Sequence, residues 1–315
     1  MTDAGGTAVR RVDDRLGLAV CRVSLSGRSL VTYTRDHVMV RTPSRPDFHD
    51  GNTLDLQAPP APEALATWVE RFRRTVGQLG ARTVQLRWEE PAATGVAGGS
   101  PSPPPALITS ARDLALSVDA TSVLLLDRLV ESPPADAQLV PIAPPSAVPG
   151  GVVDRRWHAA TVLYRYETGE TPDDWRDHDE DFVGWAVEVQ RELAAAERAQ
   201  VWLALRHGAP VGRLTFVDDR QGLATIEDVI VHPAHRRQGI AAALTAKAIA
   251  THLAVTPDTR IGIGADPGSS AERLYRRLGF RPHAVVWTLR STDPPATADP
   301  ADQGPSARRA TADGT

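Results

Sequence analysis

Two arginines and a glycine lie between an apolar segment and an alanine-rich segment. The apolar segment ends at Val231-His232-Pro233, where the proline supplies no N–H donor to a strand ladder. The alanine-rich segment begins near Gly239 and predicts a helix, whose first N–H groups have no intrahelical acceptor. Arg236 and Arg237 add positive charge beside the partial positive end of that helix. The turn therefore predicts a phosphate-binding site, although a surface turn that merely begins a helix would contain the same residues.

The spacing within this turn, together with a second block downstream, narrows the interpretation. The run Arg236 to Ala241 fits Arg/Gln-x-x-Gly-x-Gly/Ala at every fixed position, and Ala271 to Phe280 fits A-x-x-L-Y-x-x-x-G-F. In these blocks and in their order, the chain resembles the GNAT acyltransferase superfamily over residues 139–290. The resemblance implies an α/β (α+β) fold, in which helices flank a mixed central sheet. It also implies acetyl-CoA as the acyl donor.

The resemblance further implies which residues bind acetyl-CoA. The turn would hold the phosphates, while the strand before it would splay from its neighbour and pair with the pantetheine amides. The N–H groups of this strand would also polarise the thioester carbonyl. The predicted cofactor-binding residues are Val229, Ile230, Val231, Arg236, Arg237, Gln238, Gly239, Ile240 and Ala241.

Tyr275 is the first of two predicted catalytic residues. It matches the family tyrosine that hydrogen-bonds the CoA sulfur and protonates the departing thiolate, as the resemblance implies. A phenol with an ordinary pKa of about 10 suits that task. Its helical spacing with Leu274 and Leu278 would equally suit a core aromatic.

Glu227 is the second predicted catalytic residue. Transfer to an amine needs a base, because only the neutral amine attacks. By the two-residue period of a strand, we expect Glu227 to share a face with Val229 and Val231 and to accept the ammonium proton, directly or through water. A solvated strand-edge carboxylate and an ion pair with Arg213 are the alternatives for this side chain.

Two positions depart from the family pattern. Many relatives have a glutamate on the next strand, but the run Ile261 to Gly264 has none. The usual asparagine before the second block is Gly268, so pantetheine anchoring would pass to Ser269 or Ser270. These departures favour a different class of function, a non-catalytic acyl-CoA sensor or protein-interaction module.

Composition excludes several classes of partner. The 315 residues include 35 basic and 39 acidic side chains, and the net charge of −4 favours neither nucleic acid nor an anionic membrane as a partner. The chain has no apolar run near the 18 residues of a membrane span and no charged-then-apolar leader, so we expect a cytoplasmic protein. Cys21, the single cysteine, lies in an apolar run and is expected to be inert. His232 and His235 have no third ligand cluster nearby, so we assign no metal.

The chain divides into two segments with similar element order. We predict a degenerate GNAT-like domain at 1–131 with a disordered insertion at 91–105, a catalytic domain at 132–290 and a disordered tail at 291–315. Leu54 and Val84 are separated by 30 residues and Val229 and Ile261 by 32, which suggests an internal repeat. The turn that would bind phosphate in the first segment reads Gln57 to Pro62 and contains three prolines, so we expect no CoA there.

These features together predict an N-acyltransferase. It would move an acetyl or short acyl group from CoA to a primary amine of a small molecule or peptide. The motifs describe the donor site, whereas variable loops form the acceptor site, here residues 153–182 and the first segment. The acidic run from Glu167 to Asp181 would attract a cationic amine, or would be only a solvated loop that leads into a helix.

Overall fold

Short apolar runs separated by turn residues form eleven strands in the part of the chain that the structure describes. The computed structural model describes residues 15–25, 27–92, 102–132, 134–145, 152–167 and 177–291, without the side chains of 167 and 177–181. The strands are β1 (Leu30–Tyr33), β2 (His37–Arg41), β3 (Thr53–Leu56), β4 (Gln85–Pro91), β5 (Leu116–Leu126), β6 (Gln138–Pro141), β7 (Ala199–Arg206), β8 (Ala209–Asp218), β9 (Leu223–Val231), β10 (Arg260–Ala265) and β11 (Phe280–Ser291). The helices are α1 (Leu16–Arg22), α2 (Leu65–Thr75), α3 (Pro105–Asp113), α4 (Val152–Tyr164), α5 (Asp177–Ala195), α6 (Ile240–Leu253) and α7 (Ser270–Arg277).

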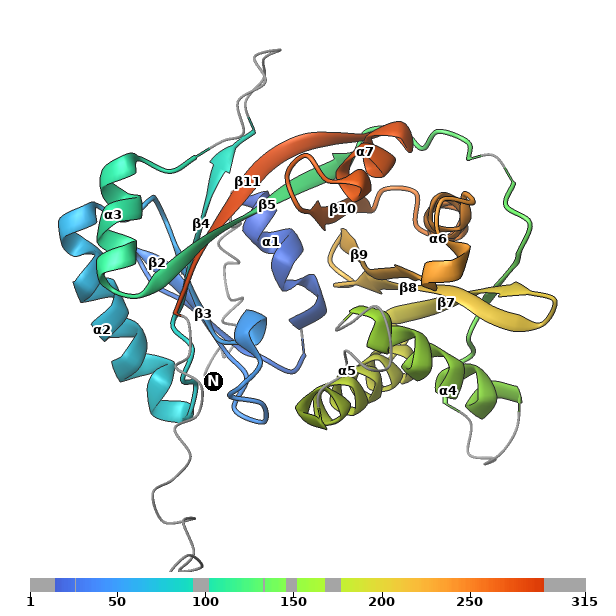
Figure 1. Cartoon of the computed structure of the whole chain (residues 1–315), viewed down its shortest axis with the longest axis horizontal. Helices are drawn as coiled ribbons and strands as arrows, with labels where there is room; N and C mark the ends of the chain where they lie inside the picture. The colour runs from blue at the N-terminus through green and yellow to red at the C-terminus, as the bar shows by residue number, and fades with distance from the viewer. Residues whose placement is uncertain are drawn as a thin grey trace, which may run out of the picture.

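All eleven strands belong to one mixed sheet. Its order is β1-β2-β3-β4-β11-β5-β10-β9-β8-β7-β6. The pairs β3–β4 and β9–β10 are parallel, and the remaining neighbours are antiparallel. The predicted α/β fold, a mixed sheet flanked by helices, is confirmed (Figure 1).

The two central strands, β5 and β11, come from different segments of the chain. Each lies on the side of the sheet that is otherwise formed by the other segment. β11 lies between β4 and β5, and β5 lies between β11 and β10. The two pair with each other over their full length, from Phe280↔Leu126 to Ser291↔Leu116 (Figure 1). The order β1-β2-β3-β4-β11 on one side thus mirrors β7-β8-β9-β10-β5 on the other. A boundary after residue 131 does not cut this sheet in two, because each segment supplies a strand that the other lacks.

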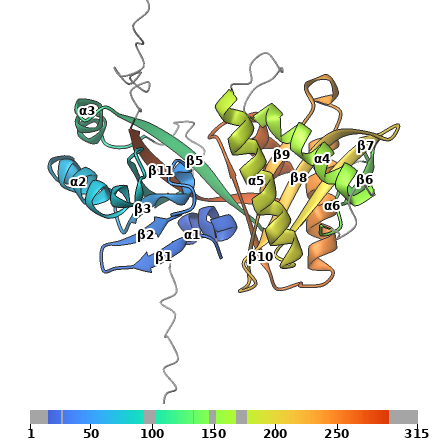
Figure 2. The same ribbon diagram turned by 90° about the horizontal axis from the view of Figure 1, so that it is seen from below.

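Successive side chains along the central strands point to opposite faces of the sheet, and a different layer of helices covers each face. On β5, Leu124 packs in the core beneath α6 and α7, whereas Val123 packs in the core beneath α1. On β11, Trp287 packs with α2 and α3, whereas Val286 packs with α1. Helices α2, α3, α6 and α7 therefore cover one face of the sheet, and α1, α4 and α5 cover the other (Figures 1 and 2).

Helix α1 lies against the centre of the sheet, and no periodic pattern in the sequence predicts it. Its Leu18 and Val20 are buried. Gly262 of β10 permits this approach, because a Cβ there would lie 2.4 Å from Val20. Burial raises the pKa of Cys21, also on α1, to about 11, so this thiol stays protonated at neutral pH.

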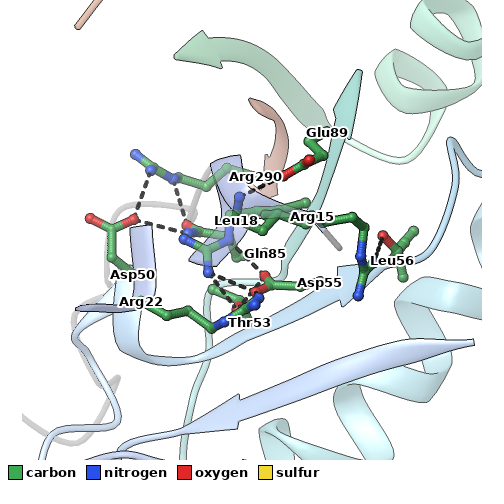
Figure 3. Close-up of polar contacts among 11 residues, drawn as sticks. Arg15, Leu18, Arg22, Asp50, Thr53, Asp55, Leu56, Gln85, Glu89 and Arg290 are labelled. Atoms are coloured by element: carbon green, nitrogen blue, oxygen red, sulfur yellow. Dashed lines mark hydrogen bonds and ion pairs between the residues drawn. The ribbon is translucent and has the colours of Figure 1, made fainter. Parts of the chain in front are cut away.

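A carboxylate between two arginines attaches α1 to the amino-terminal side of the sheet (Figure 3). Asp55 of β3 is fully buried and accepts hydrogen bonds from Arg22 Nη1 at 2.5 Å and from Arg87 Nε at 2.8 Å. Burial alone would raise the pKa of Asp55, but Arg87 and Arg22 hold it below its ordinary value. The N–H of Leu18 donates to Glu89 Oε2 at 2.6 Å and adds a second attachment. Removing one partner from such a buried network typically costs about 3–5 kcal/mol.

Two predicted low-complexity segments lie largely outside the described residues. Residues 93–101 of the expected insertion are among them, while Pro91 ends β4 and Pro105 begins α3. Ser291 ends β11, and residues 292–315 of the expected tail are not described. Across the helices that the structure does describe, none combines the length and the apolar character that crossing a bilayer requires.

Candidate functional site

Strand β9 contains an extra residue at Asp228. β8 and β9 pair as Thr215↔Glu227 and then as Arg213↔Ile230. Between these pairs lies Leu214 on β8, but both Asp228 and Val229 on β9. Asp228 has φ = 52°, in the left-handed region that residues other than glycine rarely adopt. A bulge of this kind bends a strand and redirects its side chains.

The bulge coincides with the point at which β9 separates from β10. Their parallel ladder runs from Arg260↔Leu223 to Ile263↔Ile226 and includes no later residue of β9. Beyond Ile226, the main-chain groups of β9 that point towards β10 thus have no partner in the described ladder. This is the divergence of strands that the family resemblance implies, and it leaves hydrogen-bonding groups available for a ligand.

The bulge also reverses the alternation of side chains, and the expected face of Glu227 is wrong for that reason. Ile226 before the bulge and Val229 and Val231 after it all pack in the core beneath α6 and α7. Ile230 packs against α4 and α5 instead. Glu227 lies within hydrogen-bonding reach of Ser24, which follows α1, and therefore faces the layer of α1 and α5.

The turn after β9 has the backbone that its glycine and arginines predict. Arg237 and Gly239 have φ values of 64° and 80°, and α6 begins at the next residue, Ile240. No side chain caps this helix at Gly239, so its first N–H groups point into the turn without an intrahelical acceptor. A Cβ on Gly239 would meet no heavy atom within 4 Å, which leaves the backbone open to a ligand. The geometry suits an anion.

A cleft of about 730 Å³ lies where β9, this turn and α7 meet. The predicted site residues that line it are Val229, Val231, Arg236, Arg237, Gly239, Ile240, Ala241 and Tyr275. Three predicted residues do not line it: Glu227 and Ile230 point to the other face, and Gln238 Oε1 accepts a hydrogen bond from Arg206 at 2.5 Å. The cleft thus unites the two sequence blocks, and its volume is typical of ligand sites.

Two further arginines line the cleft, and the sequence analysis missed them. Arg273 and Arg277 lie four residues apart on α7, so both point to one side of that helix. Together with Arg236 and Arg237 they give the cleft four cationic side chains. Their i, i+4 spacing beside the second block was the signal available in the sequence.

Glu131 and Ser132 also line the cleft, although they follow the amino-terminal strand β5. The loop that carries them is held against the turn after α7, where Val130 N donates to Leu278 O at 3.0 Å. Gly279 has φ = 100°, and a Cβ there would lie 1.8 Å from Arg128 O. The amino-terminal segment thus contributes to the wall of this cleft through the loop after β5.

Tyr275 lies on α7 with its ring in the cleft wall. The side chain is 5% exposed, and its ring contacts Phe280 in an edge-to-face arrangement with centroids 6.1 Å apart. Ser269 caps α7 by accepting from Glu272 N at 3.1 Å, so this hydroxyl is engaged, whereas Ser270 lines the cleft. Tyr275 therefore packs in the core and also lines the cleft.

Asp228 is held by a buried network, and this network accounts for Arg213. Asp228 Oδ2 accepts from Gln190 Nε2 at 2.6 Å and from Thr215 Oγ1 at 3.1 Å, and it lies 3.5 Å from Arg213 Nη2. Arg213 is fully buried and also donates to Ala160 O at 2.9 Å. The arginine thus pairs with Asp228 and not with Glu227, the ion pair considered from the sequence.

Glu227 has a strongly perturbed acidity. Burial, followed by the negative charge of Asp228, raises its pKa to about 8, against a hydrogen bond from Ser24 and the charge of Arg28. A carboxyl group with a pKa near neutrality is suited to exchange protons with a reactant. It lies at the bulge where β9 diverges from β10, on the face opposite the side chains of Val229 and Val231.

The histidines of the turn make local contacts. His232 Nδ1 accepts from Ala234 N at 3.2 Å, and the rings of His232 and His235 lie 5.6 Å apart. Within the described ranges, no three or more His, Cys, Asp or Glu side chains are grouped as a metal site would require.

Comparison with known proteins agrees with this geometry. A model of the acetyltransferase (GNAT) family matches residues 161–280, which contain the bulge, the turn and α7. No curated protein sequence matches the chain.

Two solved structures are similar over most of the chain. One is a functionally unknown conserved protein from Staphylococcus epidermidis ATCC 12228, with a TM-score of 0.61, 12% identity and coverage of 82% of this chain and 92% of that one. The other is a GCN5-related N-acetyltransferase from Kribbella flavida, with a TM-score of 0.56, 19% identity and coverage of 89% and 96%. At these identities the two likenesses establish the fold.

The turn gives a direct prediction for acetyl-CoA binding. Arg237→Glu should weaken binding by about 10-fold or more, because it replaces a charge-assisted contact with repulsion. Gly239→Val should weaken it similarly, since a β-branched residue strains the left-handed backbone and fills the space a ligand approaches. Calorimetric titration measures both effects.

Arg220→Glu is the matched control. Arg220 is also an arginine with positive φ, 59°, but it lies in the β8–β9 turn away from the cleft. The acetyl-CoA affinity of Arg220→Glu should match that of the unaltered protein. Unchanged affinity in both Arg237→Glu and Gly239→Val would place the donor elsewhere.

Proposed function

We propose that this chain is a GNAT-type N-acyltransferase, which moves an acetyl or short acyl group from acyl-CoA to a primary amine of a small molecule or peptide. The observation that carries the proposal is the arrangement at the open end of β9. There the arginine-rich turn and Tyr275 share one cleft, and a carboxyl group of raised pKa lies on the opposite face of the same strand.

The cleft supports acetyl-CoA as the donor. Its four arginines and the uncapped start of α6 suit a pyrophosphate and a further phosphate, while Val229 and Val231 offer an apolar wall. When bound, acetyl-CoA supplies an activated acyl group on a thioester carbon. The unpaired edge of β9 offers N–H donors to the amides and to the thioester carbonyl of such a ligand.

Glu227 and Tyr275 are proposed to move the two protons of the reaction. Glu227, when ionised, takes a proton from the acceptor ammonium, and the neutral nitrogen then bonds to the acyl carbon. As the carbon–sulfur bond breaks, the hydroxyl of Tyr275 gives its proton to the sulfur. The nitrogen then gives up its remaining extra proton, which restores the hydroxyl of Tyr275 through water, and Glu227 releases the first proton to solvent, so the atoms and charges balance.

The amino-terminal segment is proposed to be a degenerate copy that does not bind CoA. Support comes from the mirrored strand order and from Gln57 to Pro62, where a 3₁₀ turn beginning at Pro62 follows β3 in place of a glycine turn. Asp55 on β3 is fully buried between two arginines, so no reactant can reach it. We keep the limits 1–131 and 132–290 in this proposal. They delimit two copies of one ancestral unit whose strands now form a single sheet.

A non-catalytic acyl-CoA sensor is the competing function. It is favoured by β10, which has glycines at 262 and 264 and no glutamate, and by Gly268 before α7. The acidic segment proposed to attract an amine lies mostly outside the described residues. Neither nucleic acid nor a membrane is part of the proposal.

Tyr275→Phe separates the enzyme from the sensor. If Tyr275 protonates the thiolate, the variant should lose about 10²-fold or more in kcat. Its acetyl-CoA affinity should stay within about fivefold, because the ring is kept and only one hydroxyl, worth about 1 kcal/mol or less in binding, is removed. Thiol release from acetyl-CoA with a panel of amines measures turnover, and calorimetry measures binding.

Tyr33→Phe controls for loss of a phenol, since Tyr33 lies on the exposed edge strand β1. Full turnover in Tyr275→Phe on an amine that the unaltered protein acetylates would leave the tyrosine with a packing role. Acetyl-CoA binding without acetylation of any amine would support the sensor.

Glu227 gives a prediction for pH dependence. A carboxyl group acts as a base only when ionised, so kcat/KM should rise with pH through an inflection at about 8. Glu227→Gln should lose that inflection and about 10²-fold in rate at neutral pH, with the deficit narrowing once bulk pH deprotonates the amine. Asp228→Asn should move the inflection to lower pH, because the charge of Asp228 helps to raise the pKa of Glu227. A profile that is the same in Glu227→Gln would assign the titration to another group.

A further inference from the structure

Residues of the amino-terminal segment surround Glu227. Ser24 is hydrogen-bonded to it, and the charges of Arg28 and Asp50 both influence its acidity. The 3₁₀ turn Val23–Leu25, which carries Ser24, packs against β8 and β9. The proposed base therefore lies between β9 and a loop that belongs to the other segment of the chain.

Arg28 is a half-buried cation beside that base with an unused donor. Its Nη2 donates to Val189 O of α5 at 3.2 Å. Its Nε is buried and, among the described residues, has no hydrogen-bond partner. Burial lowers the pKa of Arg28 to about 10, against the charges of Glu192 and Glu227. A partly buried guanidinium is costly to desolvate, and an anion bound to its accessible side would lower that cost.

Two of the other acidic groups near Glu227 already have partners. Asp228 is engaged by Arg213, Gln190 and Thr215 as described. Asp50 accepts from Gln85 at 3.0 Å and lies 3.8 Å from Arg290 (Figure 3). Arg28 and Glu227 are thus a cation and a carboxyl group in one partly desolvated region, where Glu192 is the other acidic group whose charge acts on Arg28.

Arg28 lies beside Trp185, which belongs to a group of three aromatic rings and is also contacted by Arg45 at 5.5 Å. Its guanidinium lies 6.0 Å from the ring centroid of Trp185 on α5, and that ring lies 4.9 Å from Phe48 and 5.8 Å from Phe182. All three rings are only partly buried, and Phe48 comes from the amino-terminal segment. Such a group of rings binds an apolar or aromatic body.

We propose that the acceptor is a free α-amino acid with an apolar or aromatic side chain, whose carboxylate is bound by Arg28 while its amine faces Glu227. This proposal rests on the proposed function, because it names the acceptor of the same reaction. In an α-amino acid the ammonium and carboxylate flank one carbon, which complements a carboxyl group and a guanidinium that share a site. The role of the amino-terminal segment is then to supply the carboxylate-binding residue.

The first test compares acceptors that differ only in the carboxylate. L-Phenylalanine should be acetylated with a kcat/KM about 10- to 100-fold above that of phenethylamine and of L-phenylalaninamide, the range expected for one hydrogen-bonded ion pair. Spermidine, a polyamine without a carboxylate, should be a poor acceptor. Equal rates for phenylalanine and phenethylamine, or a preference for spermidine, would overturn the proposal and leave acyl transfer intact.

The second test uses variants of the full chain. Arg28→Gln should abolish the preference for phenylalanine over phenethylamine, and Arg28→Lys should restore part of the preference because it keeps the charge. The ratio of the two rates is the readout, because the charge of Arg28 also acts on the pKa of Glu227 and so on both rates. Arg71→Gln is the matched control, since Arg71 also lies over a tryptophan, Trp68, at 4.5 Å and pairs with Asp36, but on α2. Circular dichroism checks that each variant is folded. A preference that survives in folded Arg28→Gln overturns the proposal.

A binding measurement distinguishes this proposal from the proposed function. Calorimetry of phenylalanine with CoA-saturated protein should show affinity that Arg28→Gln lowers by about 10-fold or more. Binding that depends on Arg28 without any acetylation would uphold the carboxylate site and overturn the acyltransferase. Acetylation of phenylalanine by the unaltered protein, with unchanged phenylalanine affinity in Arg28→Gln, would uphold the acyltransferase and overturn the carboxylate site.

Discussion

The exchange of β5 and β11 is the constraint on which the rest of the structure depends. A sheet that ended at β4 or at β10 would expose an apolar edge, and each edge is instead closed by a strand from the other segment. The same exchange places α1 across the centre, where it packs on β11 and β10 and is attached to β3 by Arg22 and Asp55. It also brings the loop after β5 to the cleft that is proposed to bind acetyl-CoA, and the loop after α1 to Glu227. The two segments consequently share one core and both proposed binding regions.

Part of the backbone strain in the described residues lies at this site. Asp228 and Arg237 are two of the few non-glycine residues with positive φ, and they lie at the bulge and in the turn. Such conformations cost about 1–3 kcal/mol each and persist only where surrounding contacts enforce them. At Asp228 those contacts are the hydrogen bonds from Gln190 and Thr215 and the buried guanidinium of Arg213. The bulge places Val229 and Val231 on the face of the cleft, while Glu227 before it stays on the opposite face, where the acceptor is proposed to bind.

Much of the fold and of the donor cleft could be predicted from local patterns. The mixed sheet flanked by helices agrees with the sequence, and α6 begins at Ile240, directly after the Gly239 near which a helix was predicted. The bulge could not be predicted, because a two-residue period has no signal for one inserted residue, and Glu227 was assigned to the wrong face. Helix α1 was missed since its seven residues are too short for a periodic pattern, and its position depends on a distant glycine, Gly262. Arg28 has no motif at all: its relevance follows only from the packing of one segment on the other.

Separating the two segments tests this account most directly. The chain would be produced as fragments 1–132 and 133–315, alone and together, and titrated with acetyl-CoA by calorimetry. Because β5 completes the sheet beside β10 and β11 completes it beside β4, neither fragment alone should unfold cooperatively or bind acetyl-CoA. The co-produced pair should do both, with an affinity close to that of the intact chain. If fragment 133–315 alone folds and binds acetyl-CoA as tightly as the intact chain, the donor site does not depend on the strand exchange and the account is contradicted.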